Sequence, residues 1–109
     1  MTELALREWC RRLVASLRSR EGEPLSLVGH LKRATGEVED QELREALERA
    51  VAMVEDGYMM SVAFAQNPAV FSEHFVTTVR YGEIYAEVDV TLERYANRPE
   101  DRAIKCAYR

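Results

Sequence analysis

Apolar residues recur every three or four positions along most of the chain, which is the spacing of one buried helical face. In the first stretch Leu6, Trp9, Cys10, Leu13 and Leu17 fall on one side of a helix at about 100° per residue. The pattern therefore predicts an all-α fold.

Breaks in this pattern divide the chain into six expected helices, in two groups of three that pack as a compact antiparallel bundle. Glycines, prolines and capping side chains mark the breaks, because they end or begin helices at low cost. The expected helices run from Thr2 to the joint at Glu21–Leu25, from Leu27 to Thr35-Gly36, from the cap Asp40 to Asp56-Gly57, from Tyr58 to Gln66, from the cap Ser72 to Gly82, and from about Glu83 to Arg98.

The joint at Gly82-Glu83 is the feature around which the second half is organised. A glycine after the last periodic residue can close one helix, and a glutamate favours the positive end of the next helix dipole. In the last helix, Ile84, Val88 and Leu92 continue the apolar spacing to Tyr95, so we expect all four on the core side.

Length and composition agree with one soluble domain spanning residues 1–109. The chain is 47% hydrophobic and 31% charged, which is too apolar for a disordered chain. No apolar run approaches the roughly 20 residues that a membrane-spanning helix requires. No signal peptide is evident at Met1, and Cys10 and Cys106 are expected to be two reduced structural thiols of a cytosolic protein.

Charge is distributed unevenly along the chain. The net charge of −4 combines +3 in residues 1–36, −6 in residues 37–60 and −1 in residues 61–109. Nucleic-acid binders usually concentrate positive charge on one element, so this distribution argues against nucleic acid as a partner. The three arginines Arg7, Arg11 and Arg18 form a basic stripe, which is more often a solvated face than a binding site.

Candidate catalytic and metal chemistry finds little support. His30 and His74 have no glutamate three residues before them and no histidine three or four positions away. Glu83 and Glu87 are four apart and can share a cation on a helix face, but two carboxylates make an incomplete oxygen shell. No nucleophile elbow or glycine-rich phosphate loop is present. These absences remove the simple arguments for an enzyme, although a site can also assemble from scattered residues. We expect no cofactor and no metal.

A second apolar strip on the last expected helix favours a protein partner. Ala86 and Val90 are four apart on the side opposite the core, where a dimer or partner face would lie, although two such residues also fit ordinary surface composition.

Several motifs, taken in order, resemble one known family. They are WCRRLVASL in the first helix, the Gly22-x-Pro24-Leu25 joint, LREALERAVAMVEDG, YMMSVAFAQNPAVF, the Gly82-Glu83 pair and VDVTLERYA. Together they are similar to the cytoplasmic domain of the F-type inner-membrane platform protein of type II secretion systems and type IV pilus machines. The chain departs from the family run Gly-Glu-x-Ser/Thr-Gly, because Tyr85 and Ala86 replace the small polar residue and the last glycine.

The resemblance implies a six-helix, non-catalytic platform domain at the cytoplasmic side of the inner membrane. Its expected partners are the assembly ATPase, inner-membrane assembly proteins and a second copy in a homodimer. On this resemblance Glu83 and Tyr85 are candidate contact residues, and the acidic third expected helix and the basic stripe are candidate charged faces. Family members usually carry two such domains separated by membrane helices, and one is present here, which fits either an excised domain or a stand-alone relative.

Two other functions stay open at this point. A small helical nucleic-acid-binding regulator is the alternative that the basic first block favours. An enzyme whose site assembles from scattered residues is the third.

Overall fold

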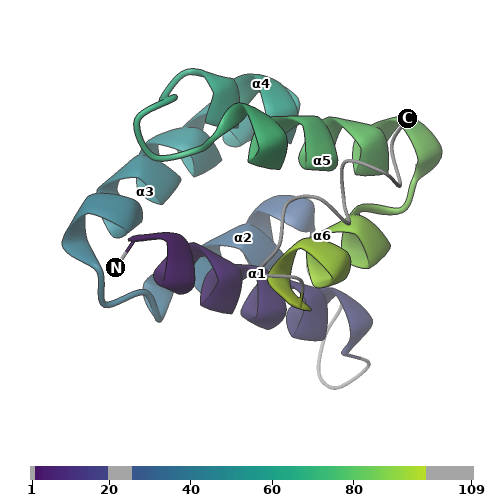
Figure 1. Cartoon of the computed structure of the whole chain (residues 1–109), viewed down its shortest axis with the longest axis horizontal. Coiled ribbons are helices and arrows are strands. Elements are labelled where there is room, and N and C mark those ends of the chain that lie inside the picture. Colours follow the sequence, from purple (N-terminus) through teal and green to yellow (C-terminus); the bar gives the residue numbers. More distant parts are fainter. Residues whose placement is uncertain (1, 20–25, 98–109) are drawn as a thin grey trace.

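Six helices make up the part of the chain described by the computed structural model, residues 2–19 and 26–97 (Figure 1). The prediction of an all-α bundle is confirmed. The helices are α1 (Thr2–Arg18), α2 (Leu27–Gly36), α3 (Gln41–Glu55), α4 (Met60–Ala65), α5 (Glu73–Tyr85) and α6 (Val88–Asn97). The side chain of Thr2, the joint at residues 21–25, the segment from residue 98 and Cys106 lie outside the described residues.

Side-chain caps begin three of the helices. Asp40 accepts a hydrogen bond from the Leu43 N–H at 2.9 Å, and Ser72 accepts one from the Phe75 N–H at 3.1 Å, so both predicted caps are confirmed. A third cap, which the sequence pattern missed, is Ser26 at the start of α2. Such caps satisfy backbone donors that have no partner within the helix, which fixes where each helix begins.

The helices form a closed ring. Each helix packs against the next along the chain, and α6 returns to pack against α1. Figure 1 shows α6 beside α1, with α4 and α5 on the opposite side of the molecule from α1. Contacts from residue 3 to residue 95 and from residue 18 to residues 89 and 93 show that α1 and α6 run antiparallel.

Aromatic side chains fill the centre of the ring. Phe64 of α4 lies 5.9 Å from the Trp9 ring, 4.8 Å from Phe71 and 5.2 Å from Phe75, measured between ring centroids. Tyr95 of α6 meets Phe75 edge to face at 5.1 Å. These separations are those of favourable aromatic pairs. One aromatic cluster therefore joins α1, α4, α5 and α6.

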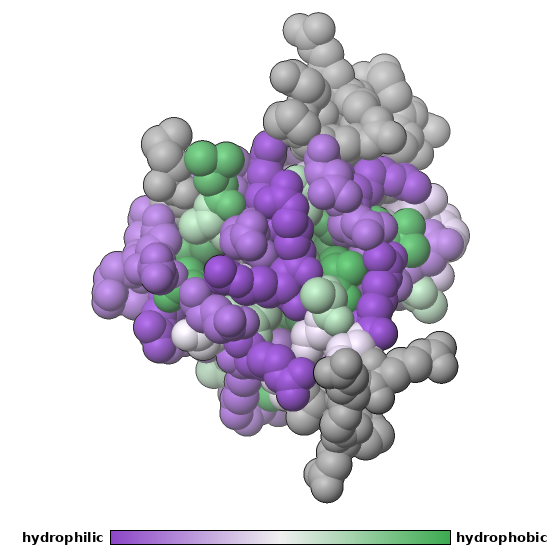
Figure 2. Space-filling model, turned by 90° about the horizontal axis from the view of Figure 1, so that it is seen from below, coloured by the Kyte–Doolittle hydropathy of each residue, from purple (hydrophilic) through white to green (hydrophobic). Residues whose placement is uncertain are grey.

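A hydrogen bond inside the core joins two helices. The Trp9 indole N–H donates to Thr35 Oγ1 at 3.2 Å, which links α1 to α2. Cys10 is fully buried, and burial raises the pKa of its thiol, with the Glu3 carboxylate adding to the effect. On the outside, Figure 2 shows a face that is mainly hydrophilic, with small separate hydrophobic areas.

Candidate functional site

The turn between α5 and α6 lies later in the chain than the sequence pattern predicted. Helix α5 continues through Gly82 and Glu83 and ends at Tyr85, and α6 begins at Val88 rather than near Glu83. The prediction of a joint at Gly82-Glu83 is therefore wrong by about one helical turn. Ala86 makes the break, with φ 57° and ψ 39°, in the left-handed region that glycine usually occupies.

Backbone hydrogen bonds complete this turn. The Gly82 carbonyl oxygen accepts from the Ala86 N–H and from the Glu87 N–H, the latter at 2.7 Å. The bond from Glu87 closes the six-residue loop of a Schellman-type helix end. The turn therefore satisfies backbone groups at the end of α5 even though an alanine stands where glycine is favoured.

Gly82 instead allows α5 and α6 to approach closely. A β-carbon at this position would meet Thr91 Oγ1 and would lie 2.8 Å from the Val88 Cα atom. Separations this short do not occur for real side chains, so any larger residue would push α6 away from α5. The glycine is required by helix packing and not by the turn.

Glu83 is directed toward α4. Its two carboxylate oxygens accept from the Ser61 N–H at 3.3 and 3.4 Å. Met59 gives α4 no side-chain cap, so a carboxylate from another helix takes this place at the positive end of the helix dipole. Glu87 lies in the turn, past the end of α5, and is exposed, so the two glutamates do not share a helix face as the sequence pattern predicted.

The outer side of this turn is apolar and exposed. Ile84, predicted to be in the core, is 64% exposed. It lies on α5 and not on α6, because the helix breaks at Ala86, so the predicted spacing from Ile84 to Tyr95 does not follow one continuous helical face. Tyr85 is 60% exposed and Val90 is 37% exposed. Ala86 lies in the turn and not on α6, so it does not form a helical strip with Val90. Tyr85, Ala86 and Val90 nevertheless all remain accessible; we call Ile84, Tyr85, Ala86 and Val90 the turn surface.

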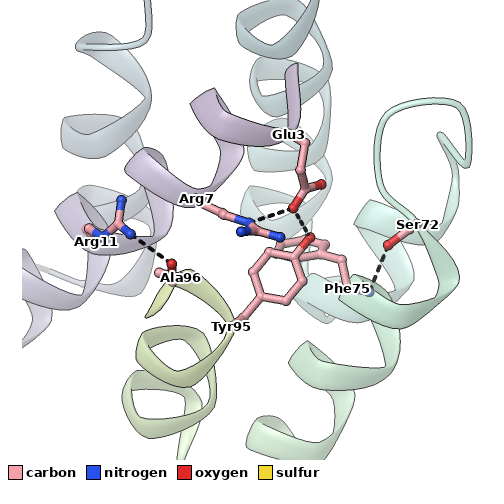
Figure 3. A network of polar contacts seen from close by, with 7 residues as sticks. All are labelled: Glu3, Arg7, Arg11, Ser72, Phe75, Tyr95 and Ala96. Atoms are coloured by element: carbon pink, nitrogen blue, oxygen red, sulfur yellow. Dashed lines mark hydrogen bonds and ion pairs between the residues drawn. The ribbon is translucent and has the colours of Figure 1, made fainter. Parts of the chain in front are cut away.

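The arginines at the start of α1 contact other groups of the same chain. Glu3 accepts from Arg7 at 3.0 Å and from the Tyr95 hydroxyl at 2.8 Å, as Figure 3 shows. The Arg7 guanidinium also lies 5.9 Å from the centre of the Tyr95 ring. Burial, and then the hydrogen bond to the Glu3 carboxylate, raises the pKa of the Tyr95 phenol.

Arg11 and Arg18 extend this connection along the seam between α1 and α6. Arg11 donates to the Ala96 carbonyl oxygen at 2.8 Å, near the end of α6 (Figure 3). Arg18 donates to Glu93 at 2.8 Å and to Asp89 at 3.2 Å. Hydrogen bonds to Glu93 and then Asp89 raise the pKa of Arg18. The basic stripe therefore joins the first helix to the last.

Sequence reasoning missed the α6 partners of this stripe. Glu3 and Tyr95 are 92 positions apart, and no local pattern connects them. The histidines also have roles that spacing did not predict: His30 Nδ1 lies 2.7 Å from Ser16 Oγ, and His74 packs against Tyr95. Among the described residues, no three histidine, cysteine or acidic side chains gather closely enough to hold a metal ion.

Comparison with protein families matches residues 9–105 to the family described as type II secretion system (T2SS), protein F. The match covers most of the chain, from Trp9 in α1 to a point beyond α6. The chain belongs to the type II secretion system protein F family. No curated protein matches the chain.

Membership of the protein F family confirms the resemblance found in the sequence. It associates the chain with the inner-membrane platform proteins of type II secretion and type IV pilus machines. None of the helices in residues 2–19 and 26–97 has both the length and the apolar character needed to cross a bilayer. Ala86, where the sequence departs from the run Gly-Glu-x-Ser/Thr-Gly described above, is the left-handed position of the turn.

Proposed function

We propose that this chain is a non-catalytic docking domain of a type II secretion or type IV pilus assembly machine. The observation that carries the proposal is the protein F family match over residues 9–105, which includes the helices from Trp9 onward. On this proposal the domain lies at the cytoplasmic face of the inner membrane. There it binds the assembly ATPase and other inner-membrane assembly proteins.

The turn surface is the contact region that we favour on this domain. Tyr85 exposes an aromatic ring, and Val90 and Ala86 extend the accessible apolar surface around it. Exposed aromatic residues with apolar neighbours are the usual anchors of protein interfaces. Arg7, Arg11 and Arg18 are weaker candidates, because a partner would have to compete with their bonds to Glu3, Ala96, Asp89 and Glu93.

A packed ring of helices is suited to mechanical coupling. Protein interiors are nearly as dense as organic crystals, so displacement of one helix is passed to its neighbours with little compression. Each helix here contacts the next, and α6 contacts α1. A movement imposed on the α5–α6 turn by an ATPase would therefore reach the rest of the ring.

The proposal is tested by co-purification of the chain with the assembly ATPase encoded in the same genome. We expect the wild-type chain to retain the ATPase, and Tyr85→Glu or Val90→Glu to release it, because a buried unpaired charge disfavours an interface. Thr77→Glu, at an exposed position of α5, is the control and should bind like wild type.

Two outcomes would contradict the proposal. One is the absence of any association with the ATPase or with inner-membrane assembly proteins. The other is tight binding to duplex DNA that weakens steeply with salt, which would favour the nucleic-acid-binding alternative. Sizing at several concentrations tests the proposed homodimer, and Val90→Glu should lower the dimer fraction if this residue lies in the interface.

A further inference from the structure

A groove lies between α2 and α3, away from the turn surface. Its volume is about 410 Å³. Gly36, Val51 and Ala52 line its apolar part, and Lys32, Glu48 and Glu55 stand around them. A β-carbon added at Gly36 would meet nothing within 4 Å, so the groove is open beside the end of α2. The small residues leave room for apolar side chains of a partner.

Two of the three charged side chains that line this groove are acidic. Residues 37–60 contain eight acidic residues against two arginines and no lysine, and all of them are described by the structure. Within that segment, Glu48 and Glu55 line the groove, and their side chains are 58% and 49% exposed. A partner with positive charge would be attracted to this side of the domain and held in register by these two carboxylates.

One pairing within the chain already shows how a cation binds at this groove. Lys32 of α2 reaches Glu55 of α3, with 2.7 Å between Nζ and the carboxylate oxygen. Both side chains remain about half exposed, so the ion pair is a weak surface contact that a partner's lysine or arginine can join or replace. Arg44 lies 3.6 Å from Glu48 in a similarly exposed pair.

The spacing of the carboxylates specifies the shape of the partner. Glu48 and Glu55 are seven residues apart on α3, which is two helical turns or about 10.5 Å. A partner helix lying along the groove would match them with basic residues seven positions apart. Apolar residues between these positions would face Val51, Ala52 and Gly36.

We propose that the groove between α2 and α3 binds a basic amphipathic helix of a partner protein. The proposal rests on the docking function above and adds the chemical class of one partner. A second copy of this chain is a poorer fit, because the basic stripe of α1 lies on a helix whose apolar face is buried in its own core.

An NMR titration of the full chain tests this proposal directly. The probe is a synthetic amphipathic helical peptide with lysines seven residues apart and leucines between them, and a matched peptide carries glutamates in place of the lysines. We expect amide shifts to concentrate in α2 and the adjoining face of α3 with the lysine peptide, and no saturable shifts with the glutamate peptide.

Neutralising the carboxylates should weaken this binding. In Glu48→Gln/Glu55→Gln we expect Kd for the lysine peptide to rise about fivefold, as for the loss of two exposed ion pairs. The control Thr77→Lys/Asn97→Lys changes the net charge by the same amount on α5 and α6 and should keep Kd within about twofold. Ala52→Trp, which fills the groove without changing the charge, should abolish the shifts in α2.

Three results would overturn the proposal: shifts that map to another face, equal binding of the two peptides, or an unchanged Kd in the double glutamine variant. Far-UV circular dichroism of each variant shows whether it is folded. If the peptide binds as expected while the ATPase does not co-purify, the docking function fails and the groove remains a binding site. If the ATPase co-purifies and the peptide results are negative, only the groove proposal fails.

Discussion

Replacement of Gly82 by alanine tests the close packing of α5 on α6. The added methyl group would lie 2.8 Å from the Val88 Cα atom, whereas ordinary contacts of this kind are about 3.4–4 Å. Helix α6 would have to move by roughly 1 Å, and overpacking of this size typically costs about 1–3 kcal/mol. Alanine also favours the helical state over glycine by about 1 kcal/mol, which offsets part of this cost. We expect a net loss of up to about 2 kcal/mol.

Gly36→Ala is the matched control for this measurement. Position 36 is also helical, and its added methyl group would meet nothing within 4 Å. The same chemical change should therefore leave stability unchanged or raise it by up to about 1 kcal/mol. Because both variants alter the unfolded chain in the same way, the difference between them isolates the packing effect.

Urea denaturation followed by fluorescence measures both variants. The chain contains one tryptophan, Trp9, which is fully buried and should report global unfolding. We expect the Gly82→Ala midpoint to fall and the Gly36→Ala midpoint to stay or rise, with equal slopes. Equal stability of the two variants would refute the packing argument. Thr91→Ala in the Gly82→Ala background should restore only part of the loss, because the Val88 backbone contact remains.

Three further substitutions test other features. Ala86→Gly should stabilise the domain by about 1 kcal/mol in thermal unfolding, because glycine adopts the left-handed conformation without the strain that alanine incurs. A destabilised variant would contradict the left-handed turn at this position. Tyr95→Phe should lower stability by about 1 kcal/mol through loss of the bond to Glu3. Because the pKa of this phenol is raised in the folded protein, the wild-type free energy of unfolding should fall as pH rises above about 10, where the unfolded tyrosine ionises. The phenylalanine variant should show a smaller fall. Parallel pH profiles of the two proteins would count against the buried phenol. Phe64→Ala should cost about 3–5 kcal/mol in urea denaturation by emptying the aromatic cluster, and a loss below about 1 kcal/mol would place that ring outside the core.

Features encoded by neighbouring residues could be predicted from the sequence. The Asp40 and Ser72 caps each act on a backbone group three residues away, so their effect is local. The apolar faces of α1 and α3 likewise follow from helical spacing, and Leu13 and Leu47 are fully buried as expected. The all-α class and the family follow from such signals in order along the chain.

Features that depend on contacts between distant segments could not be predicted in the same way. Gly82 resembled a helix stop, but its role is set by Val88 and Thr91 of the next helix, and the true stop uses an alanine that carries no turn signal. The bond of Glu83 to Ser61 likewise depends on how α5 lies against α4. The candidate contact residues Tyr85 and Val90 are accessible, but whether a partner covers them stays a prediction.

The return of α6 to α1 has a consequence for synthesis on the ribosome. The side of α1 that packs against α6 has no covering helix until the last described helix has been made, which ends about 80 residues after Arg18. At about 5–20 residues per second, this side stays uncovered for several seconds. Contacts between such distant segments also form late in folding, because the intervening loop must close first. The nascent chain is therefore exposed to premature association through its first helix until Tyr95 can reach Glu3.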